Sequence, residues 1–492
     1  MNKKEQSNKT MIESCGIEQV PENARNLSVL SMFKMMLGGG NTFPTAVIGA
    51  LPIMFGLSVQ AGLIAVFLGI LIGSLILAPM GIFGAVNGTN NAVSSVAHFG
   101  VKGRVIGSVL ALLAGFTFFC ISIWSASDAL VGSIQRLTGA TLSTSTSFIV
   151  DCTFAALAIL MCIVGFKVIV LIKKTAMWFN TSIFLLGFYA FSDYIDWGYT
   201  GTVQLGQSGF WVAFFSAIIV AMSNPISWGA FLGDWARYIP SNTPKSKICL
   251  AVFLGQMSTL TTCMFGLVTA SVVATLAPDS KNFVAGLLAT APAWYFYPLL
   301  LLALIGGLST SSGSMYGAGL DTSNLFAGKL KRVPATLLIA IFTVSFLIIG
   351  RIEQNIVGYI TTLCMLIITC TTPWVVIMLI GLFRNKSKYN HEHLQKFMKG
   401  EKGGIYWFSN GYNWRAIGAW VPSAILGVCL LNIPGVFVGP MTGLFGSLDL
   451  SLPISLLLSG ILYMILLKVY PESNDIHMKN NDINKIEASF NS

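Results

Sequence analysis

Charged residues are scarce in this sequence. Only 10% of its 492 residues are Asp, Glu, Lys or Arg, against about 25% in an ordinary soluble protein. A soluble globule of this length needs a charged surface, which 29 basic and 19 acidic residues cannot supply. The scarcity excludes a soluble enzyme of ordinary surface, a disordered chain and a coiled coil. Because 54% of the residues are hydrophobic, an integral membrane protein is the class that remains.

Clusters of metal-binding and catalytic residues are also lacking. The nine cysteines are scattered without a C-x-x-C pair, and the four histidines do not cluster with them. We therefore expect no bound cofactor, no transition-metal site and no enzymatic activity. The basic residues behind the net charge of +10 lie in short runs between apolar segments and form no patch. We expect no nucleic-acid partner and interpret these runs as signals of membrane topology.

Twelve apolar runs are each long enough to cross about 30 Å of hydrocarbon. They lie at about 28–55, 59–83, 104–134, 147–172, 175–196, 210–233, 247–276, 291–319, 333–350, 354–383, 415–440 and 449–469. Residues 1–27 form a polar tail without the pattern of a cleavable signal peptide. Residues 384–414 form a polar loop, and residues 471–492 are Asn-rich and expected to be disordered.

The connections between the apolar runs are alternately rich and poor in lysine and arginine. If both tails are cytoplasmic, the inner segments hold 25 basic residues and the outer segments hold 3. The inner connection between the fourth and fifth runs would contribute Lys167, Lys173 and Lys174. This asymmetry predicts both termini in the cytoplasm. We expect a multi-pass protein of the cell (plasma) membrane, with the lipid bilayer as its surroundings.

Two of the runs are interrupted by proline and small polar residues near mid-membrane. The sequence GGGNTFP occupies residues 38–44 in the first run, and SNPIS occupies residues 223–227 in the sixth. The backbone groups that such breaks free cannot face lipid, so they must face protein or a water-filled cavity. The breaks lie five spans apart, and an odd number of spans gives the two halves opposite orientations. Matching breaks in such halves indicate a transporter site at the midplane.

Two further runs carry polar residues, and each allows two interpretations. Residues 306–314 hold five hydroxyl side chains and three glycines, which suit either close helix packing or a site for a monovalent cation. The third run holds Phe118 and Trp124, whose rings could stack on a flat heterocycle or merely fill space between helices. Asp128, toward the outer end of this run, either lies near the interface or acts in gating or proton transfer.

Short motifs spread over nearly the whole chain. They are GIEQVPENAR at residues 16–25, FGVKG at 99–103, SWGAFLGDWARYIP at 227–240, GIYW at 404–407, GYNWRA at 411–416 and DLS at 449–451. Together they resemble the motifs of the nucleobase:cation symporters, in the purine–cytosine permease branch. The stretches at 234–238 and 412–416 are the most specific.

The resemblance implies an all-α integral membrane protein of the leucine-transporter fold type, with twelve transmembrane helices. Two inverted five-helix repeats would occupy residues 28–196 and 210–383, and two extra helices would lie in residues 415–470. It also implies import of a nucleobase or related heterocycle, with cytosine or a purine first, by symport with Na⁺ or H⁺. The alternatives are a facilitator without coupling and a transporter of another ring, such as hydroxymethylpyrimidine or allantoin. We expect a monomer.

The predicted substrate site combines the two breaks with the third and eighth runs. In the family that the chain resembles, the ring stacks on a tryptophan of the third span, and this position is Phe118 here, with a polar partner at Ser122. The expected substrate contacts are Gly40, Asn41, Thr42, Phe118, Ser122, Trp124, Ser223, Asn224, Trp228, Ser312 and Ser314.

The only predicted ion site uses oxygens of the first and eighth runs. Its expected ligands are Gly38, Asn41, Gly306, Ser309 and Thr310, and the last three share one side of a helix. An alignment on residues 314–316 instead leaves Ser309 as the only hydroxyl ligand. Because this shell contains no acid, Na⁺ is favoured over H⁺, with Asp128 as the alternative proton carrier. Asp234 and Arg237 are expected to form a structural or gating pair at the inner end of the sixth run.

Single introduced cysteines can test the predicted topology. A cysteine at Gly198 should react with a membrane-impermeant maleimide added outside intact cells, whereas a cysteine at Lys396 should react only after permeabilisation. The parent protein, with its nine native cysteines, gives the background. The opposite labelling pattern would contradict the orientation.

Overall fold

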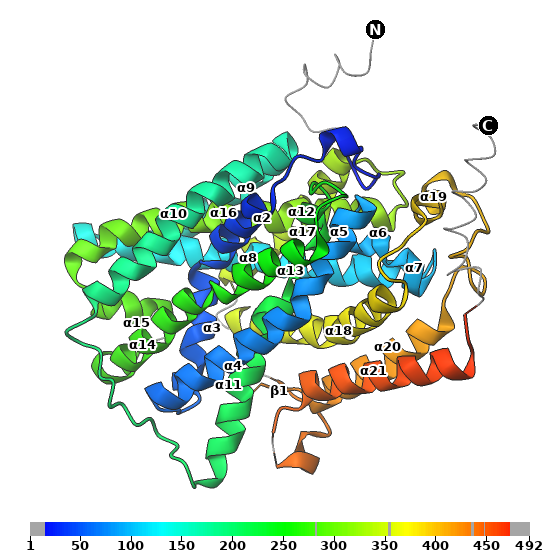
Figure 1. Cartoon of the computed structure of the whole chain (residues 1–492). Coiled ribbons are helices and arrows are strands. Elements are labelled where there is room, and N and C mark those ends of the chain that lie inside the picture. Colours follow the sequence, from blue (N-terminus) through cyan, green and yellow to red (C-terminus); the bar gives the residue numbers. More distant parts are fainter. Residues whose placement is uncertain (1–14, 281–282, 353–355, 434–436, 447, 473–492) are drawn as a thin grey trace.

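The computed structural model describes residues 15–472, except 281–282, 353–355, 434–436 and 447. Its helices pack side by side in one bundle (Figure 1). Within the described residues, ten helical segments are long and apolar enough to cross a membrane, and three apolar helices are shorter. Twelve spans result if the first two short helices form one broken span and the third forms another. That count stays a prediction.

The elements follow one another in this order. The first half holds η1 (Glu22–Ala24), α2 (Val29–Gly40), α3 (Phe43–Met54), α4 (Val59–Leu77), η2 (Ala78–Met80), α5 (Gly81–Asn87), α6 (Asn91–Ser94), α7 (Val96–Phe99), α8 (Val105–Thr138), α9 (Thr144–Val164) and α10 (Phe166–Ala190). The second half holds α11 (Ser208–Ser227), α12 (Gly233–Ala236), α13 (Lys245–Met257), α14 (Leu260–Leu276), α15 (Phe283–Thr290), η3 (Ala293–Tyr295), α16 (Phe296–Leu325), α17 (Arg332–Ile352) and α18 (Ile356–Arg384). The last part holds α19 (His391–Gln395), η4 (Lys396–Lys399), α20 (Trp414–Leu430), β1 (Asn432–Ile433), β2 (Phe437–Val438), η5 (Thr442–Phe445) and α21 (Ser451–Val469). The fold is thus all-helical apart from the short antiparallel pair β1–β2.

Helices α8 and α16 pack against each other more extensively than any other pair of described elements. Small residues let their backbones approach, because a Cβ added at Gly115 would lie only 2.8 Å from the Ser314 carbonyl oxygen. In the eighth run, a Cβ added at Gly307 would lie only 2.5 Å from the Ala126 Cβ of α8, which fits the packing interpretation of that run.

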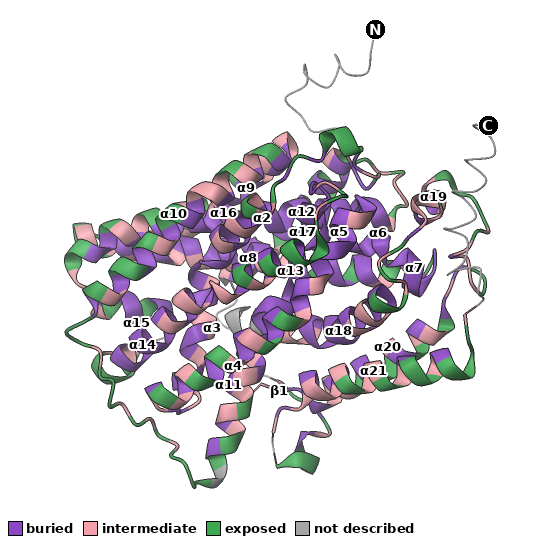
Figure 2. Cartoon of the chain, in the orientation of Figure 1, coloured by how far each residue is buried: buried purple, intermediate pink, exposed green. Residues whose placement is uncertain are grey.

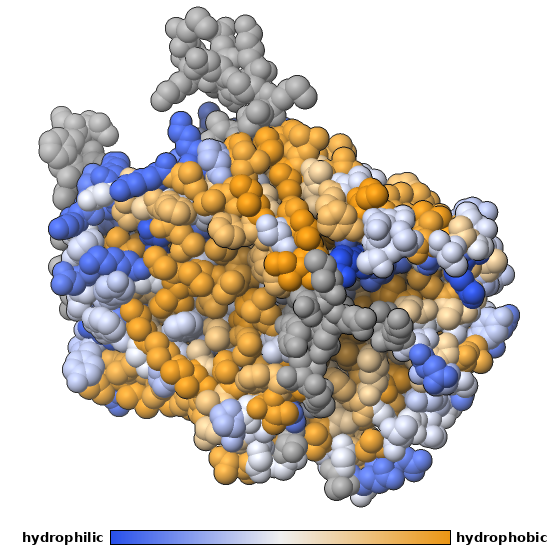
Figure 3. All heavy atoms as spheres, turned by 180° about the vertical axis from the view of Figure 1, so that it is seen from behind, coloured by the Kyte–Doolittle hydropathy of each residue, from blue (hydrophilic) through white to orange (hydrophobic). Residues whose placement is uncertain are grey.

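The surface of the bundle matches a membrane environment. Figure 2 shows buried residues concentrated around α5, α6 and α12 and many exposed ones along α20 and α21. In Figure 3, hydrophobic side chains cover most of the visible face, and hydrophilic ones gather toward its edges. Exposed side chains such as Leu171, Leu160 and Ile341 are stable in contact with lipid rather than water.

The predicted break in the first run is present. Helix α2 ends at Gly40, and the next two residues leave the helical conformation (Asn41 φ −84°, ψ 82°; Thr42 φ −144°, ψ 167°). Helix α3 then begins with Pro44 in its first turn, where a missing backbone N–H costs nothing.

The predicted break in the sixth run lies about one turn later than expected. Helix α11 continues through Pro225 and ends at Ser227, and the irregular segment is 228–232, before α12. The placement at 223–227 was therefore wrong. Two serine hydroxyls donate to the carbonyl groups three residues before them, which satisfies backbone groups around the proline.

The fourth and fifth runs meet earlier than predicted. The chain turns at Gly165, whose φ of 117° lies in the region that favours glycine. Lys167, Lys173 and Lys174 therefore belong to α10 and not to an inner loop, as the charge count had assumed. Lys173 is only 2% exposed. This charged side chain, which hydropathy predicts to be exposed to water, is thus enclosed by helices.

Three other segments differ from expectation. The stretch 84–103, expected as an inner loop, forms short helices and is almost entirely buried. Asn91 holds it to the bundle by donating to the Gly229 carbonyl oxygen at 2.7 Å. The seventh run, expected to be smooth, is interrupted between α13 and α14. The run at 415–440 is helical only to Leu430, and the β1–β2 pair follows.

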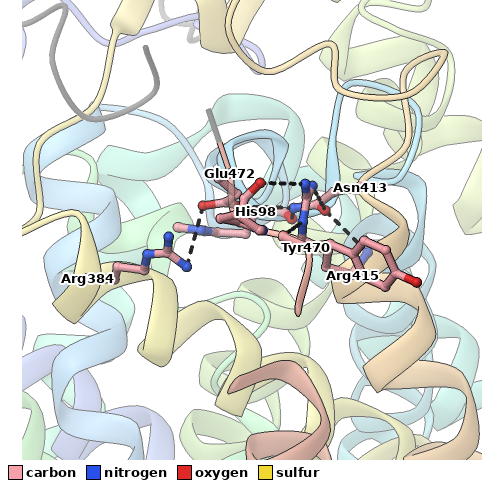
Figure 4. Close-up of polar contacts among 7 residues, drawn as sticks. His98, Arg384, Asn413, Arg415, Tyr470 and Glu472 are labelled. Carbon is pink, nitrogen blue, oxygen red and sulfur yellow. Dashed lines mark hydrogen bonds and ion pairs between the residues drawn. The ribbon is translucent and has the colours of Figure 1, made fainter. Parts of the chain in front are cut away.

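A polar network ties the last two long helices to the bundle (Figure 4). Asn413 caps α20, and its amide donates to the His98 carbonyl oxygen at 2.7 Å and to Glu472 at 3.3 Å. Glu472 also lies 3.8 Å from Arg384, at the end of α18. Near the other end of the described chain, Gln19 hydrogen-bonds to the loop that precedes α20. Both ends of the described chain therefore lie at the same end of the bundle.

The variant Asn413→Ala should lower stability, because it leaves buried acceptors without a donor. Each lost bond of this kind costs about 1–3 kcal/mol, so the melting temperature in detergent should fall by several degrees. Ser409→Ala, which changes an exposed side chain in the same loop, is the control. Equal melting temperatures for the two variants would show that the network contributes nothing.

Candidate functional site

A narrow cavity lies where the two broken helices meet α8, α10 and α16. Its volume is about 30 Å³. Since one water molecule needs about 10–15 Å³ on this scale, a heterocyclic ring does not fit in this conformation. The structure therefore represents a closed form of the site. The cavity is lined by Gly39, Thr42, Pro44, Thr45, Ile48, Phe118, Lys173, Asn224, Trp228, Phe231, Trp235, Thr310 and Ser314.

Aromatic rings form part of the cavity wall. Phe118 belongs to α8, and Trp228, Phe231 and Trp235 belong to α12 and the segment before it. The Trp228 ring centroid lies 5.1 Å from that of Trp235, at an interplanar angle of 88°, and 5.7 Å from that of Phe231. Rings at these separations attract one another, and a ring face can stack on a flat heterocycle.

Neutral polar groups complete much of the lining. The Asn224 amide is buried, and its nitrogen donates to the Thr259 hydroxyl at 3.4 Å. Thr259 lies in the unexpected interruption between α13 and α14, so that interruption supports the site. A side-chain amide both donates and accepts hydrogen bonds. It can therefore pair with the ring nitrogens and carbonyl oxygens of a nucleobase-like ligand.

Five predicted substrate contacts line the cavity, and six do not. The five are Thr42, Phe118, Asn224, Trp228 and Ser314. The other six make contacts elsewhere. Gly40 lies against Thr259, Trp124 packs on Phe346, and the Asn41 side chain donates to Thr181. The hydroxyls of Ser122, Ser223 and Ser312 donate to the backbone carbonyls of Phe118, Val220 and Ser309, respectively. Their roles in binding stay predictions.

The predicted cation ligands of α2 and α16 lie together beside the cavity. The Ser309 hydroxyl donates to the Gly38 carbonyl oxygen at 3.0 Å. The Thr310 hydroxyl donates to the Gly39 carbonyl oxygen at 3.3 Å. Two members of the predicted ion shell, the Gly38 carbonyl and the Ser309 hydroxyl, are thus hydrogen-bonded to each other between α2 and α16.

Sequence analysis missed two residues of α10 at this place. Asn180 donates to the Asn41 carbonyl oxygen at 2.9 Å and lies against Gly306. The Lys173 ammonium donates to the Ser309 carbonyl oxygen at 3.0 Å and lies 4.5 Å from the centroid of the Trp235 ring. A clue was available in the sequence, because a lysine followed by a mostly apolar stretch up to position 190 can belong to a spanning helix.

One end of the bundle, predicted to be the outer one, contains a charged cluster. Arg351 of α17 donates to Asp128 of α8 at 2.6 Å and to Asp151 of α9 at 2.9 Å. Asp128 keeps 41% of its side chain exposed, and its position near the membrane interface stays a prediction. Its second interpretation, in gating or proton transfer, stays a prediction.

A second charged cluster lies at the inner end of the sixth run. The Arg237 guanidinium interacts electrostatically with the Asp234 carboxylate and donates to the Tyr316 hydroxyl at 2.8 Å. Asp321 of α16, which sequence analysis missed, is buried in the same cluster. The cluster connects α12 with α16, which suits the predicted structural role.

Comparisons with known proteins agree with this architecture. A family model described as permease for cytosine/purines, uracil, thiamine, allantoin matches residues 19–454. The Bacillus subtilis protein YxlA, assigned as a purine-cytosine permease, is 23% identical over 476 residues, which cover 93% of this chain and 96% of that protein. The vitamin B6 transporter TPN1 of Saccharomyces cerevisiae is 25% identical over 366 residues, which cover 69% of this chain and 60% of that protein.

One solved structure has the same fold over nearly the whole chain. It is Mhp1, a nucleobase-cation-symport-1 family transporter, in a closed conformation with bromovinylhydantoin bound. The TM-score is 0.71 at 15% sequence identity, and the match covers 96% of this chain and 100% of that one. Since the family model spans most of the sequence, this chain belongs to the family of membrane permeases for cytosine/purines, uracil, thiamine and allantoin, and it is a transporter rather than an enzyme.

Proposed function

We propose that this permease imports a nucleobase or related nitrogen heterocycle, with cytosine or a purine as the first candidates, by symport with a monovalent cation. The observation that carries the proposal is the position of the aromatic-lined cavity, between the broken segments α2–α3 and α11–α12. Broken helices around a central cavity are the arrangement through which alternating access operates in secondary transporters.

The cavity lining favours a flat, polar ring over other small molecules. Phe118 and Trp228 offer ring faces for stacking, and Asn224 offers both a donor and an acceptor. Among the described residues no carboxylate lines the cavity, so a cationic substrate has no counter-charge there. A cationic heterocycle is therefore disfavoured as the ligand.

Coupling to a cation is supported by the oxygen-rich contact between α2 and α16. Gly38, Ser309 and Thr310 lie there beside the substrate cavity, so an ion bound at this contact would affect both helices. The sequence favours Na⁺ over H⁺, because the shell contains no acid. We expect the transporter to act as a monomer in the plasma membrane, with both termini in the cytoplasm.

Two other functions compete with this proposal. A facilitator would use the same cavity without an ion, and a permease for a different ring would use it with other hydrogen bonds. The names of the relatives show that such rings include vitamin B6 compounds, and hydroxymethylpyrimidine and allantoin belong on the same panel.

Transport by the purified protein in liposomes can decide among these functions. Vesicles loaded with unlabelled ring should take up the labelled ring by exchange for each true substrate. Cytosine, adenine, hypoxanthine, uracil, hydroxymethylpyrimidine, allantoin and pyridoxine form the panel. Accumulation above the outside concentration under an imposed Na⁺ or H⁺ gradient would support symport, whereas equilibration under both gradients would identify a facilitator. Exchange of none of these rings would refute the proposal.

Substitutions in the cavity should weaken binding of the ring that exchanges best. Asn224→Ala removes a buried hydrogen bond, which costs about 1–3 kcal/mol and so about 5- to 150-fold in affinity. Phe118→Ala should have a comparable effect through lost stacking. Phe116→Ala is the matched control, because Phe116 lies on the same helix and packs on Phe346, away from the cavity. Unchanged affinity in both cavity variants would show that the site is misplaced.

A further inference from the structure

Lys173 lies beside the group of oxygens that the sequence predicted as an ion shell. Its ammonium donates to the backbone oxygen of Ser309, and the hydroxyl of the same Ser309 donates to the Gly38 carbonyl oxygen. Two glycines make room for it: a Cβ at Gly39 would lie 2.7 Å from the ammonium nitrogen, and a Cβ at Gly313 would lie 2.8 Å from it. The side chain is therefore built into the contact between α2 and α16.

The oxygens of this shell already have donors from the protein. The Gly38 oxygen accepts from Ser309, the Asn41 oxygen accepts from Asn180, and the Ser309 oxygen accepts from Lys173. Each of these carbonyl oxygens keeps a second lone pair that could bind a sodium ion, but that ion would lie next to the positive charge of Lys173. Like charges at contact distance repel strongly where water is excluded. The arrangement thus favours the ammonium over a metal cation.

No ion pair neutralises Lys173 within the part of the chain that the structure describes. The titratable side chain that interacts electrostatically with Lys173 is Cys162 of α9, which donates to the Ser312 carbonyl oxygen at 3.0 Å. The carboxylate of Asp234, which belongs to α12, faces Gly317 of α16 rather than Gly313. The other titratable groups on the surrounding elements are Lys34 of α2, Asp151 and Cys152 of α9, Cys263 of α14, and Tyr316 and Asp321 of α16. A buried lysine without a carboxylate partner can exist as a neutral amine, which is how lysines serve as bases in proteins.

We propose that the Lys173 amine is the proton-binding group of this permease, and that its ammonium occupies the place of a coupling sodium ion. The inference rests on the proposed function and specifies its coupling ion. The amine accepts a proton from water when the site is open to the outside and releases it to water when the site is open to the inside. The transported cation is then H⁺, and no metal ion is required.

The same contacts explain how the proton and the ring affect each other. Lys173 lines the substrate cavity, and its ammonium rests on the Trp235 ring, which also lines the cavity. A ring that enters the cavity changes the surroundings of Trp235 and therefore those of the ammonium. Because coupling between two sites is reciprocal, the protonated amine should favour ring binding and the ring should favour the protonated amine.

Proton-driven accumulation in liposomes tests the proposal, with the membrane potential held at zero. Labelled cytosine is the probe, or adenine if cytosine does not exchange. With one proton per ring, the wild type should accumulate the probe up to about tenfold for each unit of inward pH gradient. A sodium gradient at equal pH should leave the ratio at one.

Two substitutions separate proton transfer from a structural role of the charge. Lys173→Met removes the amine, and Lys173→Arg keeps a positive charge that does not leave. Exchange should be slower in both variants, and their accumulation ratio should fall to one. Lys167→Met, at an exposed position of the same helix, should retain the wild-type ratio. Recovery of accumulation in Lys173→Arg would overturn the proposal, because charge alone would then suffice.

Other results would also overturn it. Sodium-driven accumulation by the wild type at equal pH would assign the coupling to Na⁺. Proton-driven accumulation by Lys173→Met would assign the proton to another group, such as the Asp234 and Asp321 cluster. If neither variant folds, the affinity of the wild type for cytosine or adenine can be measured instead. This affinity should rise as the pH falls and should not depend on Na⁺. An affinity that increases with Na⁺ would refute the inference. Absence of exchange by the wild type would instead refute the proposed function, and this inference with it.

Discussion

A backbone group that leaves its helix inside a membrane must find its partner within the protein, and the site depends on this requirement. At the first break, the Gly38 carbonyl oxygen accepts from Ser309 of α16, and the Gly40 carbonyl oxygen accepts from Thr45 of α3. Each bond that satisfies the break also attaches it to a neighbouring helix. The polar groups that the break requires are therefore the same groups that surround the cavity, so stability and binding place common demands on these residues.

The parts of the fold that could be predicted are those with a local cause. Glycines followed by asparagine and proline end one helix and start another whatever surrounds them, so the first break was located correctly at 38–44. The family motifs and the apolar runs together indicated a multi-pass transporter, and the comparisons confirm the family and the fold. Phe118, Thr42 and Asn224 were predicted as substrate contacts, and they do line one cavity, although their role in binding still awaits a test.

The parts that escaped prediction depend on contacts between distant segments. Hydropathy alone predicts that Lys173 is exposed to water. Only the packing of α10 against α2 and α16 shows that its ammonium is enclosed. The sixth run keeps its helix through Pro225, and the Ser223 and Ser227 hydroxyls there donate to backbone carbonyl groups, which hydrophobic periodicity does not report. The buried stretch 84–103 looked like a loop because asparagine and glycine are common in loops, yet there the asparagines bind buried partners such as the Gly229 carbonyl oxygen.

The closed cavity sets a condition on any ligand. At about 30 Å³ it must widen before a ring can enter, and the close backbone packing of α8 on α16 resists widening on that side, because Gly115 leaves no free space against Ser314. Another part of the wall is built from side chains on the irregular segment after α11 and on the short helix α12. Trp235 of α12 belongs to that wall, and the Lys173 ammonium lies on its ring. A ligand that displaces this wall therefore also changes the environment of the buried charge, so occupancy of the cavity and the protonation of Lys173 cannot be independent.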